Sequence, residues 1–145
     1  MKQVQKLKLS TVVGLLLFQV SLVYAAPAVL TISTKGEEMA FDKSELAVKA
    51  GQKVKLTFKN LSSMQHNWVL TNPGTVDDVV NASIAAGNDK GWLAEGPNVL
   101  KHTKLVDPKK EETIEFTAPT KPGEYPFVCT FPGHASMMKG VLKVN

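Results

Sequence analysis

The stretch "KVKLTFKN", residues 53–60, indicates most clearly which kind of fold this chain adopts. Its apolar residues Val54, Leu56 and Phe58 alternate with lysines and a threonine. A period of two predicts a β-strand, because successive side chains of a strand point to opposite faces of its sheet. The stretch therefore predicts a sheet with one face in the core and the other in water.

Short segments of similar character recur along the chain between glycine, proline and asparagine residues. With residues 53–60 they make about eight strands, the others being 28–34, 44–51, 66–71, 98–106, 112–119, 123–130 and 140–145. Many short strands at regular spacing with turn residues between them are typical of an all-β sandwich or barrel. We expect its strands to pair in an antiparallel manner.

One segment, "TVDDVVNASIAAGN" at 75–88, departs from this pattern. Its apolar residues at roughly helical spacing are Val76, Val79, Val80 and Ile84. Thr75 stands at a plausible N-cap and Gly87 at the far end. The segment predicts a short helix in an inter-strand connection, packed on the sandwich by that apolar face.

Residues 1–25 have the composition of a secretory signal peptide. Three lysines precede an apolar run, which ends in small residues before Ala26. We expect cleavage there, leaving residues 26–145 as a single domain that is periplasmic or otherwise exported. The alternative is an uncleaved N-terminal anchor, although the run is short and interrupted for a membrane span.

The charge of the chain argues against nucleic acid as a partner. The 17 basic residues are all lysine and outnumber the 13 acidic ones, for a net charge of +4. Cleavage after residue 25 leaves 14 lysines against 13 acidic residues, so the net charge becomes +1. Arginine, which recognises bases and phosphates in a bidentate manner, does not occur.

Cys129 is the only cysteine, which is unusual for an exported protein because cysteines pair under oxidising conditions. A lone exported cysteine implies an intermolecular disulfide, a reactive thiol, deep burial or metal ligation. It opens the stretch "CTFPGHASMM" at 129–138, which also contains His134 and Met138. Paired C-x2-C or H-x3-H spacings, which structural zinc sites commonly use, are missing.

A third strong ligand must come from elsewhere, and two other histidines exist. His66 precedes the strand expected at 66–71, next to a turn, whereas His102 lies in the middle of an expected strand. We favour His66 and expect His102 to be a surface or half-buried residue. Two histidines, one cysteine and a weak axial methionine are the ligands of blue-copper electron-transfer sites.

Two segments, "MQHNWVL" (64–70) and "CTFPGHASMMKGVLKV" (129–144), closely resemble the copper-binding segments of the azurin and auracyanin branch of the cupredoxins. Residues 35–52 resemble the corresponding segment of auracyanins, while the segments "DKGWL" (89–93) and "HTKLV" (102–106) are more similar to those of azurins. The resemblance implies an eight-stranded Greek-key sandwich that binds one type 1 copper and acts as a soluble electron shuttle.

Residue by residue, His66, Cys129 and His134 match the equatorial copper ligands of that family. Met138 matches the axial ligand because it directly precedes Lys-Gly, with Met137 as the alternative. Gln65 stands where azurins have a glycine whose carbonyl is a very weak ligand, so its carbonyl is a further candidate.

Other matched residues surround the ligands. Asn67 matches an asparagine that ties the two ligand loops together, and the N–H of Phe131 matches a hydrogen-bond donor to the cysteine sulfur. An apolar rim around His134 would offer a docking surface, formed by Met64, Phe131, Pro132 and Met137. Trp68 is expected in the core and Trp92 against the helical connection.

The leading functional hypothesis is one-electron transfer by a copper that cycles between Cu(II) and Cu(I). Its partners would be respiratory or photosynthetic, such as c-type cytochromes or membrane redox complexes, and no small-molecule substrate is expected. The chain would act as a monomer. The alternative is a copper carrier or storage protein, although the Met- or His-rich tracts typical of open carrier sites are missing. An enzymatic role is not expected, because copper enzymes need further ligands and only three histidines are present.

Overall fold

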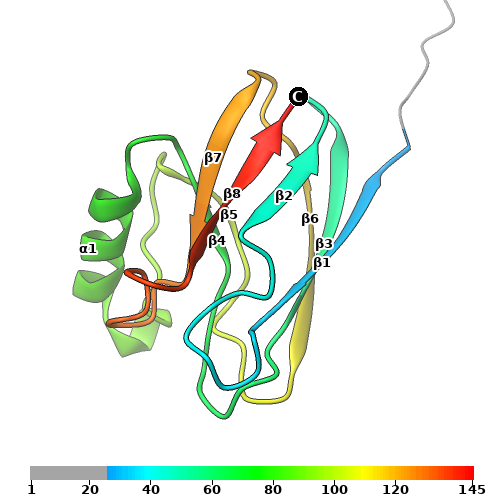
Figure 1. Ribbon diagram of the computed structural model, residues 1–145. Coiled ribbons are helices and arrows are strands. Elements are labelled where there is room, and N and C mark those ends of the chain that lie inside the picture. The colour runs from blue at the N-terminus through cyan, green and yellow to red at the C-terminus, as the bar shows by residue number, and fades with distance from the viewer. Residues whose placement is uncertain (1–25) are drawn as a thin grey trace, which may run out of the picture.

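The computed structural model describes residues 26–145, and the expected signal peptide lies outside the described residues. Two sheets pack face to face (Figure 1), one in the order β1-β3-β6 and the other in the order β2-β8-β7-β4-β5. The strands are β1 (Ala28–Ser33), β2 (Glu45–Val48), β3 (Lys53–Lys59), β4 (Val69–Thr71), β5 (Val99–His102), β6 (Glu111–Thr117), β7 (Gly123–Val128) and β8 (Lys139–Val144). The expected eight-stranded sandwich is confirmed. Within residues 26–145, no helix has the length and apolar character needed to cross a membrane.

Strand direction differs in part from the expectation. β1 pairs with β3, and β2 with β8, in a parallel manner, whereas the other pairs are antiparallel. The alternation of apolar and polar residues shows which face of a strand is buried but carries no signal for the direction of its neighbour. The antiparallel expectation is therefore wrong for these two pairs.

The core lies between the sheets and is rich in aromatic side chains. Trp68, directly before β4, is fully buried, as expected, with ring centroids 5.7 Å from Phe127 and 6.0 Å from Phe116. In β3, Val54, Leu56 and Phe58 are all buried, in agreement with the alternation of 53–60. Burial of such side chains contributes about 1.5–3 kcal/mol each.

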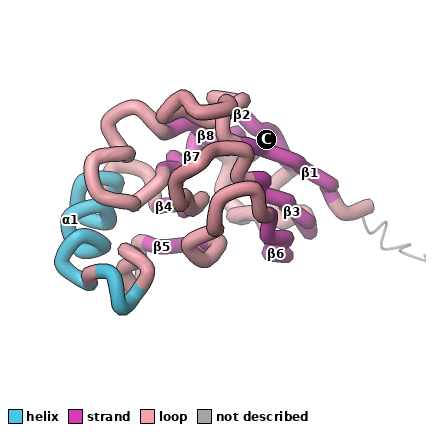
Figure 2. Tube along the Cα trace, turned by 90° about the horizontal axis from the view of Figure 1, so that it is seen from below, coloured by secondary structure: helices cyan, strands magenta, loops and turns pink. Residues whose placement is uncertain are grey.

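Helix α1 (Val76–Ala86) covers the outer face of the five-stranded sheet, where Figure 2 shows it at one side of the strands. Val79 packs with Val69 of β4 and Val128 of β7, and Ala135 joins them from the loop after β7. All three residues of β4 are buried, because the core lies on one of its faces and the helix on the other.

One detail of the helix was predicted incorrectly. Ile84 is 43% exposed, and Ser83 is buried in its place, with its hydroxyl accepting a hydrogen bond of 2.9 Å from the Ala94 N–H. Thr75 occupies the N-cap position, as predicted, but its hydroxyl forms no capping hydrogen bond and donates to the carbonyl of Asn72 at 2.9 Å.

Most strands are shorter than expected, and in two of them, β4 and β5, the change affects the metal site. β4 begins only at Val69, because the Trp68 N–H donates to the hydroxyl of Thr103 at 2.9 Å instead of joining a ladder. β5 ends at His102, and beyond it Val106 forms an isolated bridge with His66. His66 therefore lies in an irregular segment before β4, not in a strand.

Candidate metal centre

The strand order brings three buried side chains to one end of the sandwich. β4 pairs with β7 so that Val69 lies opposite Val128, which places the segment before β4 beside the residues after β7. His66 belongs to the first segment, and Cys129 and His134 to the second. The cysteine is fully buried and each histidine is only 2% exposed.

The three side chains direct one nitrogen or sulfur atom each at a common point. The two Nδ1 atoms of His66 and His134 are 3.2 Å apart. Cys129 Sγ is 3.8 Å from Nδ1 of His66 and 3.5 Å from Nδ1 of His134. Bonds of about 2.0 Å to nitrogen and about 2.3 Å to sulfur in one plane place the nitrogens about 3.5 Å apart and each about 3.7 Å from the sulfur. The triangle therefore has the size of a three-coordinate metal site.

Burial favours the neutral form of all three groups when no metal is bound. It raises the pKa of the Cys129 thiol from 9.0 to about 11, and hydrogen bonds from the backbone N–H groups of Asn67 and Phe131 oppose this rise. Burial also lowers the pKa of His66 to about 4, assisted by the charge of His134, and lowers the pKa of His134. A metal that binds here must displace the thiol proton.

Asn67 connects the two segments that carry the three groups. Its side-chain amide donates to the hydroxyl of Thr130, and its side-chain carbonyl accepts the Thr130 N–H, both at 2.8 Å. The Thr130 hydroxyl in turn donates to the carbonyl of Trp92 at 2.6 Å. Neither the role of Thr130 nor the hydrogen bond from the Asn67 N–H to the cysteine sulfur was predicted. A polar residue directly after the cysteine is a signal that could have suggested the role of Thr130.

The loop after β7 is a compact turn. The N–H of His134 donates to the carbonyl of Phe131 at 3.0 Å, and the N–H of Met138 donates to the carbonyl of His134 at 2.8 Å. The Met138 carbonyl accepts the N–H of Cys129 at 3.0 Å, which closes the turn. Within this turn Gly133 has a φ of 84°, a left-handed conformation that favours glycine.

The candidates outside the triangle have distinct positions. Met138 is fully buried and packs in the same core cluster as Cys129, whereas Met137 is 60% exposed. The Gln65 amide donates to Asp107 at 2.7 Å, which fixes the residue directly before His66. His102 is half-buried at the end of β5 and does not belong to the metal-binding group.

The donor set suits copper. A thiol and two imidazoles combine a soft donor with borderline ones, a combination that selects copper or zinc. Of the described residues, these three form the group of His, Cys, Asp and Glu side chains whose ligand atoms lie within 4.8 Å of one another. Carboxylates, which hard cations prefer, are not part of it.

Comparisons with known proteins agree with this chemistry. Residues 28–145 match the family described as "Copper binding proteins, plastocyanin/azurin family". The chain is 41% identical over 125 residues to auracyanin-A of Chloroflexus aurantiacus, which covers 83% of this chain and 76% of that protein. It is 42% identical over 85 residues to azurin of Pseudomonas denitrificans, which covers 57% of this chain and 66% of that protein.

The fold agrees as well. The solved structure of auracyanin A, described as a "blue" copper protein from Chloroflexus aurantiacus, superposes with a TM-score of 0.77 at 41% identity. The match covers 83% of this chain and all of that one. The family model matches nearly all the described residues, and the structure has both the sandwich topology and a triangle of two imidazoles and a thiol. The chain therefore belongs to the plastocyanin/azurin family of copper-binding proteins.

Proposed function

We propose that this protein transfers single electrons by cycling one type 1 copper between Cu(II) and Cu(I). His66, Cys129 and His134 are its equatorial ligands and Met138 its axial ligand, with the Gln65 carbonyl as a further weak ligand. The convergence of Sγ and two Nδ1 atoms within 3.2–3.8 Å of one another carries the proposal. Proteins of the azurin and auracyanin family carry electrons and are not enzymes.

The surrounding residues keep the ligands nearly still. Copper supplies the one-electron chemistry, and a blue-copper ligand set accepts both of its oxidation states. The Asn67–Thr130 pair holds the two ligand segments in register, and the N–H groups of Asn67 and Phe131 orient the sulfur. Little movement of the ligands between the two states means a low barrier to electron transfer. The enclosed position of the ligands is less suited to a carrier, which must release its metal.

Electrons would enter and leave through an apolar surface around His134. The Phe131 ring lies on the His134 ring, with centroids 4.7 Å apart. Met64 and Met137 are 46% and 60% exposed, and Pro132 is half-buried. These four residues form a docking surface of the small kind that transient redox partners use.

The cellular setting follows from the same proposal. Residues 1–25 have the sequence character of a cleaved secretory signal, which places the domain of residues 26–145 in the periplasm or another exported compartment. A monomer would meet its partners there, namely c-type cytochromes or membrane redox complexes. Neither nucleic acid nor a small-molecule substrate is part of this function.

Electrochemistry tests the proposal. The copper-loaded protein should show one reversible one-electron wave, and a reduced c-type cytochrome should reduce it rapidly in a stopped-flow experiment. Met137→Lys, which places a charge on the docking surface, should slow that reaction and leave the potential unchanged. Copper that binds without a reversible wave would refute electron transfer and favour carriage or storage.

A further inference from the structure

The enclosed metal centre raises the question of how a metal reaches it. A cavity of about 400 Å³ lies beside the centre, and both His66 and His134 contribute to its lining. The other lining residues are Glu37, Met39, Ser62, Ser63 and Met64. Each imidazole is only 2% exposed, and this cavity is lined by both of them.

Two methionines from separate parts of the chain line this cavity. Met39 lies in the connection between β1 and β2, and Met64 in the turn before His66. Met39 is half-buried and packs against the core cluster, whereas Met64 is 46% exposed. Both residues line the cavity, and methionine side chains are flexible. Thioether sulfur is a soft donor that binds Cu(I) well. A methionine-lined site is thus present although the sequence has no methionine-rich tract.

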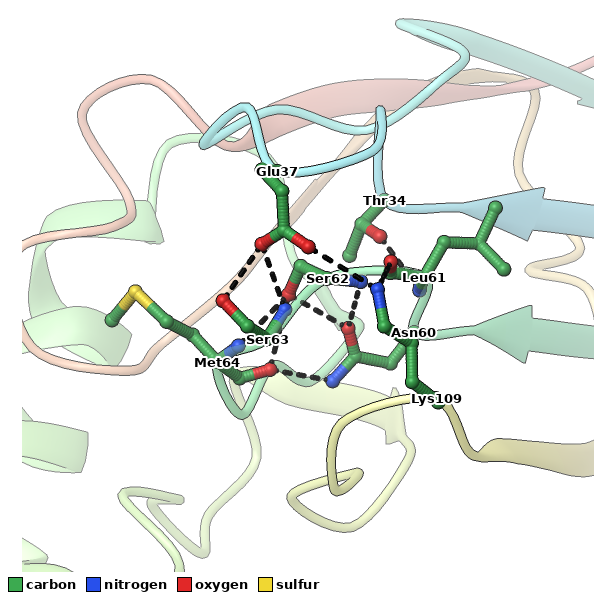
Figure 3. A network of polar contacts seen from close by, with 8 residues as sticks. All are labelled: Thr34, Glu37, Asn60, Leu61, Ser62, Ser63, Met64 and Lys109. Carbon is green, nitrogen blue, oxygen red and sulfur yellow. Dashed lines mark hydrogen bonds and ion pairs between the residues drawn. The ribbon is translucent and has the colours of Figure 1, made fainter.

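The backbone around Met64 is fixed by polar contacts, whereas its side chain is not part of them. The Asn60 amide donates to the Met64 carbonyl at 2.7 Å, and the Met64 N–H donates to the Ser62 hydroxyl at 3.2 Å. Figure 3 shows the Met64 side chain pointing away from this polar cluster. The sulfur is therefore carried on a rigid support and remains available to a ligand.

The only carboxylate of the cavity lining is already engaged. Glu37 Oε2 accepts hydrogen bonds from the N–H and the hydroxyl of Ser63, both at 2.8 Å. Its Oε1 lies 3.2 Å from the ammonium of Lys109, which also binds the Leu61 carbonyl (Figure 3). The donors left for a metal are thioethers and imidazoles, a set that favours Cu(I) over hard cations.

From these contacts we propose that the cavity is the route by which Cu(I) loads the metal centre, with Met39 and Met64 as its first ligands. The ion passes by ligand exchange from the thioethers to His66 and His134. The Cys129 thiol then binds and releases its proton to solvent, while the metal stays Cu(I). The proposal rests on the function proposed above, because it presupposes that copper occupies the centre.

Loading kinetics of the metal-free protein test this route. Cu(I) is supplied without oxygen as its acetonitrile complex, samples are oxidised with ferricyanide at set times, and the blue absorption measures the filled sites. The double variant Met39→Leu/Met64→Leu keeps the volume of both side chains and removes their sulfur. It should load Cu(I) about tenfold more slowly, as is typical when a residue that assists a metal site is lost. The exposed Met137, which is not part of the lining, provides the matched control as Met137→Leu.

Loading with Cu(II) distinguishes the loss of the thioether donors from a general change in packing. Thioethers discriminate little in favour of Cu(II), so the double variant should take up Cu(II) at the wild-type rate and reach the wild-type final absorption. Equal Cu(I) rates in wild type and double variant would overturn the proposal. So would an equal slowing of Cu(I) and Cu(II), or the same slowing of Cu(I) in Met137→Leu. If the wild-type protein forms no blue centre with either ion, the proposed function itself fails.

Discussion

Asn67 and Thr130 exchange two hydrogen bonds of 2.8 Å each, although they are 63 residues apart. Each is a direct neighbour of a candidate ligand, Asn67 of His66 and Thr130 of Cys129. Both residues are fully buried, so these bonds form away from water. The pair is therefore the mechanical link between the two segments of the metal centre.

We expect Asn67→Ala to lower the free energy of unfolding of the metal-free protein by about 2 kcal/mol, because the Thr130 N–H is left buried without its partner. It should also broaden the copper absorption by loosening the ligands. Denaturant titration measures the first effect. Asn81, exposed on helix α1, is the control, and Asn81→Ala should change stability by less than about 0.5 kcal/mol. A stable Asn67→Ala protein with an unchanged spectrum would show that the pair does not position the centre.

Gly140 is required for packing, since it lies opposite Phe127 in the pairing of β7 with β8. A Cβ at this position would lie 2.4 Å from Cζ of Phe127 and 2.6 Å from the carbonyl oxygen of Ser44. Gly140→Ala should therefore destabilise the protein by about 2 kcal/mol through overpacking. Thermal or denaturant unfolding measures this, with Lys139→Ala as a neutral control at the exposed neighbour. Wild-type stability of Gly140→Ala would mean that the space for glycine is not needed.

Substitution of the two adjacent methionines should affect the redox potential differently. Met138→Leu removes a buried thioether with little change in volume, so the protein should stay folded and blue. Its potential should rise, because a lost donor destabilises Cu(II) more than Cu(I). Met137→Leu, at a 60% exposed position, should leave the potential unchanged. Voltammetry of both variants decides which sulfur is the axial ligand, and a shift in Met137→Leu alone would reverse the assignment.

Glu37 should contribute to stability in a pH-dependent manner. Its hydrogen bonds from Ser63 and its ion pair with Lys109 lower its pKa from 4.5 to about 2. Since the folded state favours the charged carboxylate, the contribution is full above about pH 4.5 and is lost as the pH falls towards 2. Exposure to solvent keeps the effect modest.

Glu37→Gln should accordingly be less stable than the wild type near neutral pH, and the difference should shrink as the pH falls through this range. Denaturation midpoints at a series of pH values measure it. Glu38→Gln is the control, because the Glu38 carboxylate forms an exposed ion pair with Lys35, at 2.9 Å. A Glu37→Gln deficit that is constant from neutral pH to about pH 2 would contradict the linkage.

Local pattern was sufficient to predict most of the fold. The alternation of residues 53–60 reports burial directly, and β3 follows it from Lys53 to Lys59. Where long-range contacts intervene, the pattern misleads. Thr103 accepts the N–H of Trp68. Ser83 is buried instead of Ile84 and accepts the N–H of Ala94. Such exchanges depend on residues that are distant in sequence, so a local pattern cannot contain them.

The candidate site, like the fold, could be predicted from the sequence only in part. The spacing of Cys129, His134 and Met138 is visible in the sequence because these residues share one turn. The position of His66 next to a turn favoured it over His102, and the resemblance to cupredoxins added Asn67. The structure brings His66, Cys129 and His134 together, while their role as copper ligands remains a prediction. That Met39 and Met64 line one cavity was not predictable, because it depends on how the β1–β2 connection lies relative to the turn before His66.

The absorption spectrum of the copper-loaded protein tests the central claim most directly. If His66, Cys129 and His134 hold one type 1 copper, the protein has an intense absorption band in the red-orange that disappears on reduction and returns on oxidation. The band is missing from Cys129→Ser, which keeps the fold but loses the thiolate. A protein that stays colourless with bound copper, or a Cys129→Ser variant as blue as the wild type, would contradict the account.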